Sequence, residues 1–204
     1  MARRTKDEAE QTRNALLDAA EEVFYEHGVA RTSLAEIAKA AGVTRGAVYW
    51  HFRDKIELCE AMAQRVFLPQ EEVIDRLASS HSLQPLEDLK TACCDVLKLI
   101  ATDKRRYRVI SILTHRCEYV EEMAAVMRRR HECKDHLLKR CQLLFERARK
   151  LGQLSPVWKP RLAAIGLQSL MSGLIVNSLE GRKQFDLGKT GPACIGAFFN
   201  SLIP

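Results

Sequence analysis

The sequence predicts an all-α protein, and three observations support this fold class. Apolar residues recur at intervals of three and four positions along nearly the whole chain, which is the spacing of one helix face. No convincing segment alternates apolar and polar residues as a half-buried strand does. Glycine, proline, serine, threonine and aspartate stand where these patterns begin and end, as they do at helix termini. We therefore expect about nine helices.

Two helices are expected in the first 42 residues. The first covers residues 12–27 and ends before Gly28, a residue that favours helix termination. The second begins after Ser33, which forms a capping box with Glu36, and ends at Gly42. Both helices therefore have local signals for their ends.

A very short third helix is expected over residues 45–51, because Thr44 is a good N-cap. A fourth opens at Asp54, which is followed three residues later by Glu57. We expect it to stop near Pro69, since a proline inside a helix removes a hydrogen bond.

A larger region follows, and its patterns are also helical. Three prolines stand at expected first turns, where proline is tolerated: Pro85, Pro160 and Pro192. The helices expected in this region cover residues 70–79, 85–102, 104–113, 118–150, 160–180 and 191–202.

The charge of the chain is unevenly distributed. The formal net charge is +6, yet residues 1–55 hold nine Lys/Arg and nine Asp/Glu. Within that segment, residues 31–55 contain five basic and two acidic residues. A nucleic-acid contact surface needs such a local excess of positive charge.

Cysteine usage and the N-terminus indicate a cytoplasmic protein. The seven cysteines are irregularly spaced and form no CxxC pair. The first residues, MARRTKDEAEQTR, contain no apolar leader, so a secreted disulfide framework is not expected. No uninterrupted apolar run approaches the length of a membrane span, and we expect no membrane partner.

The stretch VTRGAVYWHFRDK, residues 43–55, carries the chemistry that we assign to a nucleic-acid contact. Two helices joined by a tight glycine turn form a helix-turn-helix unit, whose second helix lies in the major groove. Arg45 can offer a forked donor to a guanine edge, and Gly46 allows close approach to DNA. Tyr49 and His51 can bind phosphates. The alternative is that the aromatic residues only fill a core, and we favour that for Phe52.

The segment GVARTSLAEIAKAAGVTRGAVYWHFRDKIEL resembles the N-terminal domain of the TetR family of transcriptional repressors. The opening MARRTK and the later ILTHRCEYVEEM narrow the similarity to multidrug-efflux repressors of the AcrR and TtgR type. The resemblance implies a helix-turn-helix DNA-binding domain over residues 1–55 and a ligand-binding and dimerisation domain over residues 56–204. It also implies a homodimer that binds a palindromic operator in double-stranded DNA. The DNA-facing residues would be Ser33, Thr44, Arg45, Gly46, Tyr49, Trp50, His51 and Lys55.

The same resemblance implies a pocket for a hydrophobic small-molecule inducer among the helices of the larger domain. Soft and small side chains recur there, which suits a pocket that accepts varied ligands. The expected pocket residues are Val96, Ile100, Ile110, Thr114, Leu137, Cys141, Gln168 and Met171. The last two helices would form the dimer interface.

Enzyme chemistry is not expected. The sequence contains no nucleophile with a base, no glycine-rich phosphate loop and no paired carboxylates in a recognisable context. His131, Cys133 and His136 supply too few ligands for a structural zinc site, so we predict neither metal nor cofactor. Two alternatives stay open: a TetR-type regulator that senses a metabolite, acyl conjugate or metal, and a helical ligand carrier that does not use DNA.

Overall fold

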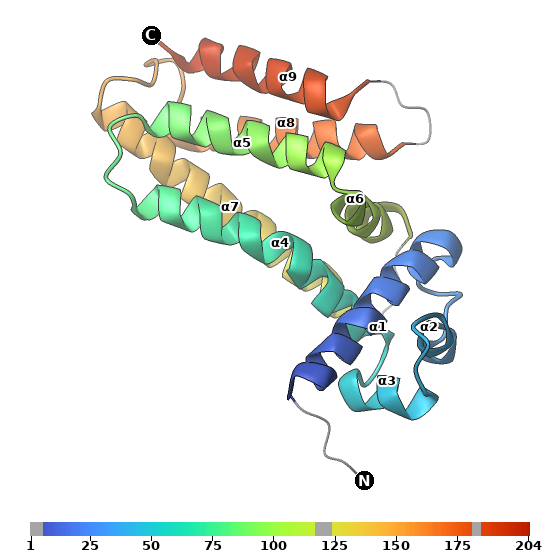
Figure 1. The fold of residues 1–204 in the computed structure, drawn as a ribbon. Coiled ribbons are helices and arrows are strands. Elements are labelled where there is room, and N and C mark those ends of the chain that lie inside the picture. The colour runs from blue at the N-terminus through green and yellow to red at the C-terminus, as the bar shows by residue number, and fades with distance from the viewer. Residues whose placement is uncertain (1–5, 117–123, 181–184) are drawn as a thin grey trace. The chain divides into compact units, whose positions relative to one another are not determined.

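The computed structural model describes residues 6–116, 124–180 and 185–204. Within these ranges it contains nine α-helices, one π-helical turn and no strand (Figure 1), which confirms the all-α class. In chain order the elements are α1 Lys6–His27, α2 Leu34–Ala40, α3 Arg45–His51, α4 Lys55–Ser79, α5 Pro85–Thr102, α6 Lys104–Ser111, η1 Ile112–Arg116, α7 Ala124–Lys150, α8 Pro160–Leu179 and α9 Leu187–Leu202.

The chain forms two compact units. Unit 1 comprises Met1–Val66 and Arg108–Arg129, and unit 2 comprises Phe67–Tyr107 and Arg130–Pro204. Unit 1 therefore combines the N-terminal helices with the end of α6, the turn η1 and the start of α7. The functional division at residues 55 and 56 stays a prediction about what each part does.

Local capping sets the short helices of unit 1 as the sequence predicted. The Ser33 hydroxyl accepts a hydrogen bond from Glu36 N, while the Glu36 carboxylate accepts from Ser33 N at 2.7 Å. Thr44 Oγ1 accepts from Ala47 N at 3.2 Å and starts α3. Asp54 Oδ1 accepts two backbone N–H bonds at the start of α4. Each cap satisfies donors that a helix end leaves free.

Several predicted boundaries were wrong. The helix α1 begins at Lys6 instead of Thr12, and α6 is followed by the π-helical turn up to Arg116. Of the predicted helix 118–150, residues 118–123 lie outside the described residues, and α7 is described from Ala124 onward.

The two largest errors concern proline. The helix α4 continues through Pro69 to Ser79, and α9 contains Pro192 in its interior. An earlier cap explains the second case, because Asp186 Oδ1 accepts from Gly188 N and Lys189 N and starts α9 there. In α4, contacts with α7 beyond the proline offset the lost backbone hydrogen bond.

Those contacts between α4 and α7 are polar. Asp75 Oδ1 lies 2.6 Å from Arg140 Nε and 2.9 Å from His136 Nε2. About one turn after Asp75 on α4, the carbonyl of Ala78 accepts a hydrogen bond from Arg147 of α7 at 3.0 Å. The guanidinium thus binds a carbonyl of the last turn of α4, where the helix dipole favours a positive charge.

In unit 2, α5 and α9 pack at close range. A Cβ on Gly191 would lie 2.9 Å from Leu97 Cδ1, and one on Gly188 would lie 3.3 Å from Ala101 Cβ. The absence of a side chain at these two glycines thus lets the helices approach without displacing Leu97 or Ala101. Aromatic rings from α7, from α9 and from the loop before α8 lie beside this packing. The ring centroids of Phe145 and Phe199 are 6.3 Å apart, and those of Trp158 and Phe198 are 5.8 Å apart.

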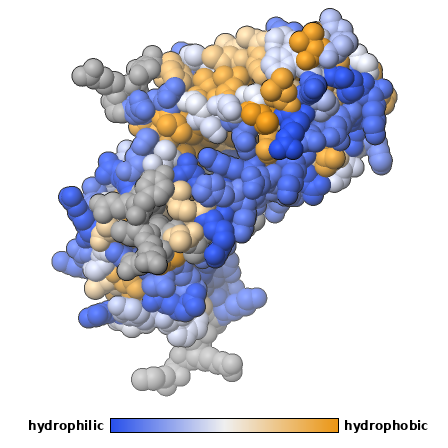
Figure 2. Space-filling model, turned by 180° about the vertical axis from the view of Figure 1, so that it is seen from behind, coloured by the Kyte–Doolittle hydropathy of each residue, from blue (hydrophilic) through white to orange (hydrophobic). Residues whose placement is uncertain are grey.

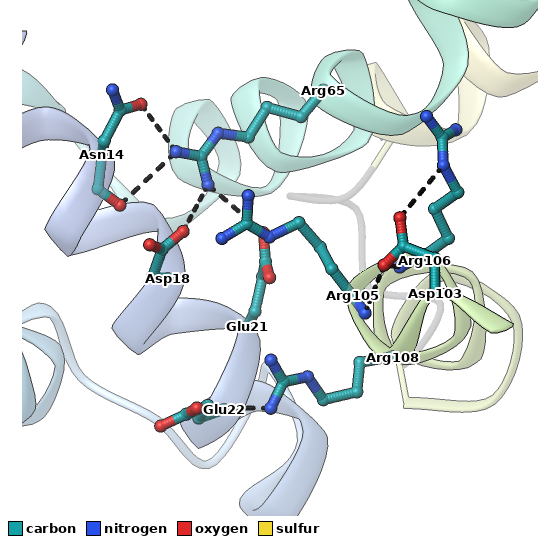
Figure 3. A network of polar contacts seen from close by, with 9 residues as sticks. All are labelled: Asn14, Asp18, Glu21, Glu22, Arg65, Asp103, Arg105, Arg106 and Arg108. Carbon is teal, nitrogen blue, oxygen red and sulfur yellow. Dashed lines mark hydrogen bonds and ion pairs between the residues drawn. The ribbon is translucent and has the colours of Figure 1, made fainter.

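Unit 1 has an apolar core, and Arg65 makes ionic contacts beside it (Figure 3). Side chains in this core that are 2% exposed or less include Leu16, Leu17, Ala20, Phe24, Ile37, Ala38, Val48, Phe52, Leu58 and Met62. Arg65 of α4, only 20% exposed, reaches α1 beside this core. Its guanidinium lies 2.7 Å from Asp18, 3.3 Å from the fully buried Glu21 and 2.6 Å from Asn14 Oδ1.

We expect Arg65→Met to lower the free energy of unfolding by roughly 3 kcal/mol, because it removes a cation that faces a buried carboxylate. Urea unfolding followed by circular dichroism measures the loss. The matched control is Arg53→Met, since Arg53 pairs with Glu57 but its side chain is 84% exposed. That change should leave the free energy of unfolding nearly unchanged, because water screens an exposed ion pair. Equal, small losses in both variants would show that the Arg65 contact does not stabilise unit 1.

Candidate nucleic-acid interface and ligand region

The short helix α3 presents polar and aromatic groups on its outer side. Val48 is fully buried and fixes the inner face, whereas Tyr49 is 49% and Trp50 73% exposed. Phe52, at the C-terminal end, is 2% exposed, as the core interpretation predicted for it. Two large aromatic side chains exposed on a seven-residue helix are more than its own folding needs.

Arg45 and Tyr49 form a pair one turn apart. The Arg45 guanidinium lies over the Tyr49 ring, 5.8 Å from its centroid, in a cation–π contact. This contact orients the guanidinium but leaves its N–H groups able to donate. The next two residues also contact each other: the rings of Trp50 and His51 meet edge to face, with centroids 4.5 Å apart. The outer face of α3 is therefore partly ordered by its own side chains.

No contact in the described part of the chain explains why residue 46 is a glycine. A Cβ at this position would meet a single atom within 4 Å, Thr44 Oγ1 at 4.0 Å. Its φ is not positive, so an alanine would fit without strain. Glycine in a helix costs about 1 kcal/mol relative to alanine. The open space above Gly46 is thus a place where an outside group can approach the backbone.

Besides Thr44, which caps α3, two further predicted contact residues have structural partners. The Ser33 hydroxyl is engaged in the capping box of α2. The hydrogen bond from the Ser33 backbone N–H, followed by the one from its hydroxyl, holds the pKa of the Glu36 carboxyl below the usual value. Lys55 Nζ donates to the carbonyls of Val29 at 3.0 Å and Ala30 at 3.2 Å. An ammonium has three donors, so one N–H of Lys55 is left for a phosphate.

Further exposed cations lie in the same part of the chain. Arg31 precedes α2, Lys39 lies in its last turn, and Arg53 follows α3. The excess of basic residues in the sequence of 31–55 predicted a positively charged surface here. No sequence motif predicted which individual cations would form it. By contrast, the contact of Lys55 with a turn more than twenty residues earlier has no sequence signal.

The predicted ligand residues are divided between the units. Six lie in unit 2, on α5 (Val96, Ile100), α7 (Leu137, Cys141) and α8 (Gln168, Met171). Ile110 and Thr114 lie in unit 1, on α6 and η1. The eight predicted pocket residues therefore do not all belong to one compact unit.

In unit 2, the structure shows the state of two thiols and of the Gln168 amide near the predicted ligand residues. Burial, followed by the neighbouring Cys141, raises the pKa of the Cys93 thiol, and burial raises the pKa of Cys141 to about 12. Both thiols are therefore neutral and act as soft apolar groups. The amide of Gln168 is not free, because its Nε2 donates to the carbonyl of Lys134 at 2.7 Å.

The residues weighed as metal ligands serve other contacts. His136 faces Asp75, as described above. Among the residues that the structure describes, no three His, Cys, Asp or Glu side chains cluster in a way that would hold a metal ion.

The helix α8 differs from the expectation about membrane spans. Its 20 residues are long and apolar enough to cross a membrane by length and composition alone. A single helix of this kind is weak evidence, because the core helices of soluble proteins pass the same test. More informative is that Leu162 and Ile165 on α8 are 52% and 41% exposed.

Comparison with known proteins agrees with this architecture. Residues 16–62 match the model of the bacterial regulatory proteins of the tetR family. Residues 84–203 match the C-terminal region of the MAATS-type transcriptional repressors.

Individual relatives span nearly the whole chain. The transcriptional repressor BepR of Brucella suis is 41% identical over 200 residues, which cover 98% of this chain and 96% of BepR. The crystal structure of NalD, the secondary repressor of the MexAB-OprM multidrug efflux pump in Pseudomonas aeruginosa, has a TM-score of 0.86 at 37% identity, covering 97% of this chain and 98% of NalD. The SmeT–triclosan complex has a TM-score of 0.87 at 31% identity, covering 95% of this chain and 92% of SmeT.

These relatives are regulators and not enzymes, as the sequence predicted. The matches extend over both the helix-turn-helix region and the larger helical region. The chain belongs to the TetR family of bacterial transcriptional regulators.

Proposed function

We propose that this protein is a dimeric repressor that binds a palindromic operator, controls a multidrug efflux pump and is released from DNA by hydrophobic small molecules. The observation that carries the DNA-binding part is the outer face of α3, where Arg45, Tyr49 and Trp50 are exposed around a glycine that the fold does not need. The relatives named above support efflux control, since NalD is described as an efflux-pump repressor. The site of action is the bacterial cytoplasm.

On the operator, α3 would enter the major groove with its N-terminal end towards the bases. Arg45 would bind a guanine edge with two N–H donors, and the backbone at Gly46 would approach the sugar-phosphate chain. The phosphates would be contacted by the remaining predicted residues, which are Ser33, Thr44, Tyr49, Trp50, His51 and Lys55. Two copies would place two such helices about 34–36 Å apart, one turn of DNA.

The helices α8 and α9 are our candidates for the dimer interface. Leu162 and Ile165 on α8 are exposed apolar side chains. Figure 2 shows apolar surface on one face of the molecule. Gly173 on α8 and Gly196 on α9 have no atom within 4 Å of a built Cβ. No contact among the described residues thus explains either glycine, whereas close approach of a second copy would. Pairing of α8 and α9 from two copies would bury this surface in a four-helix bundle.

The inducer would bind among the residues predicted from the sequence. Apolar side chains of α5, α7 and α8, with the neutral thiols of Cys93 and Cys141, suit a ligand that is mostly hydrocarbon or aromatic. The solved complex of SmeT with triclosan supports this ligand class. Thr114, on η1, would be a polar contact.

Coupling between ligand and DNA would pass through η1, because this turn is part of unit 1 and binds α1. Val29 N donates to the carbonyl of Arg116 at 3.3 Å, and the Arg116 guanidinium lies 4.9 Å from the centroid of the Tyr25 ring. At the end of α6, Arg108 pairs with Glu22 of α1 at 3.2 Å (Figure 3). A π-helical turn is rare and often marks a functional site.

The proposal is tested by fluorescence anisotropy on DNA from upstream of the gene, at stated salt, with and without triclosan. Tight, sequence-dependent binding that triclosan reverses supports it. Tight binding that a panel of hydrophobic drugs leaves unchanged contradicts the ligand class and favours a metabolite or metal. If genome-wide selection finds no bound sequence, the DNA-binding role is excluded.

We expect Arg45→Ala to weaken operator binding by about 1–3 kcal/mol and to relax preference at one base pair per half-site, because a bidentate base contact is lost. Anisotropy on a set of single-base operator variants measures both effects. Lys39→Ala is the control: loss of a phosphate contact weakens all sequences alike. Unchanged base preference in Arg45→Ala would remove Arg45 from the readout.

Gly46→Ala should change stability and DNA binding in opposite directions. The methyl group has room in the free protein, so the free energy of unfolding should rise by up to about 1 kcal/mol. Operator affinity should fall, because the same methyl group blocks close approach of the backbone to DNA. Thermal unfolding and anisotropy are measured on the same preparation. A gain in stability with unchanged affinity would show that Gly46 does not lie against DNA.

Arg108→Ala is expected to weaken induction more than folding. The ion pair with Glu22 joins partly exposed side chains, so its loss should cost less than about 1 kcal/mol of stability. The ratio of operator Kd with and without triclosan should shrink, since allosteric coupling is typically only 1–3 kcal/mol. Lys104→Ala, an exposed cation at the start of α6, should leave the ratio unchanged. Equal ratios in both variants would exclude this route.

A further inference from the structure

Four apolar side chains are exposed on three neighbouring segments of unit 2. One lies in the loop between α4 and α5, two lie between α7 and α8, and one follows α9: Leu83, Leu151, Val157 and Ile203. Their exposed fractions are 73%, 42%, 84% and 57%, in that order. Single exposed apolar side chains are common on protein surfaces, but a group of four indicates a contact surface.

Hydrogen bonds hold the three segments together. Gln153 Nε2 donates to the carbonyl of Leu83 at 2.7 Å, and Ser155 N donates to the carbonyl of Leu202 at 2.8 Å. The loop before α8 is thus bound on one side to the loop before α5 and on the other side to the end of α9. Figure 1 shows both loops and the C-terminus at the same end of the helices of unit 2. The exposure of the four side chains is therefore a property of the fold.

Basic residues accompany these apolar side chains. Residues 147–161 contain five basic residues and no acidic residue. Four of the five are exposed, namely Arg149, Lys150, Lys159 and Arg161. We call the four apolar side chains and these four cations the basic–apolar end of unit 2. A partner that covers it must be negatively charged and must also offer an apolar environment.

The charge argues against a second copy of the chain as this partner. A twofold contact centred on the basic–apolar end would bring the same surface against itself. The cations of residues 147–161 would then face their own counterparts, and like charges that meet in an interface repel each other. The pairing of α8 and α9 proposed above does not need this contact.

The polar groups of the loop before α8 favour a lipid surface over a protein partner. The Arg149 guanidinium donates to the carbonyls of Ser155 and Trp158, and the Gln153 amide is bound to Leu83. A specific protein interface carries about ten direct hydrogen bonds, which need polar groups in a fixed pattern. A lipid surface needs only inserted apolar side chains and cations near its phosphates. The basic–apolar end meets this second requirement.

We propose that the basic–apolar end of unit 2 docks on the surface of a bilayer that contains anionic phospholipids. The four apolar side chains enter the boundary between headgroups and acyl chains, and the exposed cations lie beside the phosphates. The sequence prediction of no membrane partner rested on the lack of a spanning segment, and a peripheral contact needs none. This contact is independent of the operator and of the inducer.

Co-sedimentation of the full-length protein with vesicles tests the proposal. One set of vesicles contains equal parts of phosphatidylglycerol and phosphatidylcholine, and the other contains phosphatidylcholine alone. A double variant, Lys150→Gln with Lys159→Gln, removes two cations of the basic–apolar end. A second variant, Val157→Ser, removes its most exposed apolar side chain.

Matched controls make the same kinds of change elsewhere in unit 2. Lys98→Gln with Lys104→Gln removes two exposed cations of α5 and α6, and Leu99→Ser removes an apolar side chain that is 41% exposed. Thermal unfolding followed by circular dichroism shows that each variant is folded. Sedimentation velocity gives the dimer fraction of each variant without vesicles.

We expect the wild-type protein to bind the vesicles with phosphatidylglycerol, to ignore phosphatidylcholine alone and to dissociate at high salt. Each cation near an anionic surface contributes roughly fivefold to the partition coefficient, so the double lysine variant should bind about 25-fold more weakly. Val157→Ser should bind roughly threefold more weakly or worse, because an apolar contact is lost. Both controls should stay close to wild type.

Four results would overturn the proposal. Absence of binding to either vesicle type would leave an acidic protein segment as the occupant of matching chemistry. Equal losses in the double lysine variant and its control would show attraction by net charge alone. Wild-type binding by Val157→Ser would exclude insertion of the apolar side chains. A lower dimer fraction in Val157→Ser would assign this end to the contact between copies.

Discussion

The ionic contact between Arg65 and α1 is the constraint on which unit 1 depends. Glu21 lies on the inner side of α1 and is fully buried, so its charge needs a cation close by. Arg65 supplies it from α4 and also binds Asp18 and Asn14. This fixes the position of α4 along α1, and α1 in turn carries the core residues against which α2 and α3 pack. The exposed face of α3 is therefore oriented by a contact that lies outside the helix-turn-helix segment.

A second fixed point is the turn between α1 and α2. Gly28 adopts a φ of 82°, which a residue with a side chain rarely does, and it allows the chain to reverse after α1. The following Val29 is held through its N–H by Arg116 and through its carbonyl by Lys55. One peptide segment thus joins η1, α2 and the start of α4. A change in η1 reaches α2 through backbone hydrogen bonds and needs no movement of the apolar core.

Local chemistry explains which features were predictable from the sequence. The ends of α2, α3 and the start of α4 follow from Ser33, Thr44 and Asp54, whose partners lie within three residues. The DNA-facing candidates followed from the same short segment. What could not be predicted depends on distant contacts: Lys55 binds a carbonyl 26 residues away, and Gln168 binds one 34 residues away. Pro69 was misjudged for the same reason, because packing of α4 against α7 decides whether the helix continues.

The continuation of α4 through Pro69 has a consequence for how one helix can serve two purposes. Its first half is anchored to α1 by Arg65 and its second half to α7 by Asp75. Between these anchors, the proline removes one backbone hydrogen bond, at a cost of about 3 kcal/mol relative to an unbroken helix. A continuous helix would transmit any tilt rigidly, and two separate helices would transmit none. A helix weakened at one position can bend there, and in this chain each half of the helix keeps its own anchor on either side of the proline.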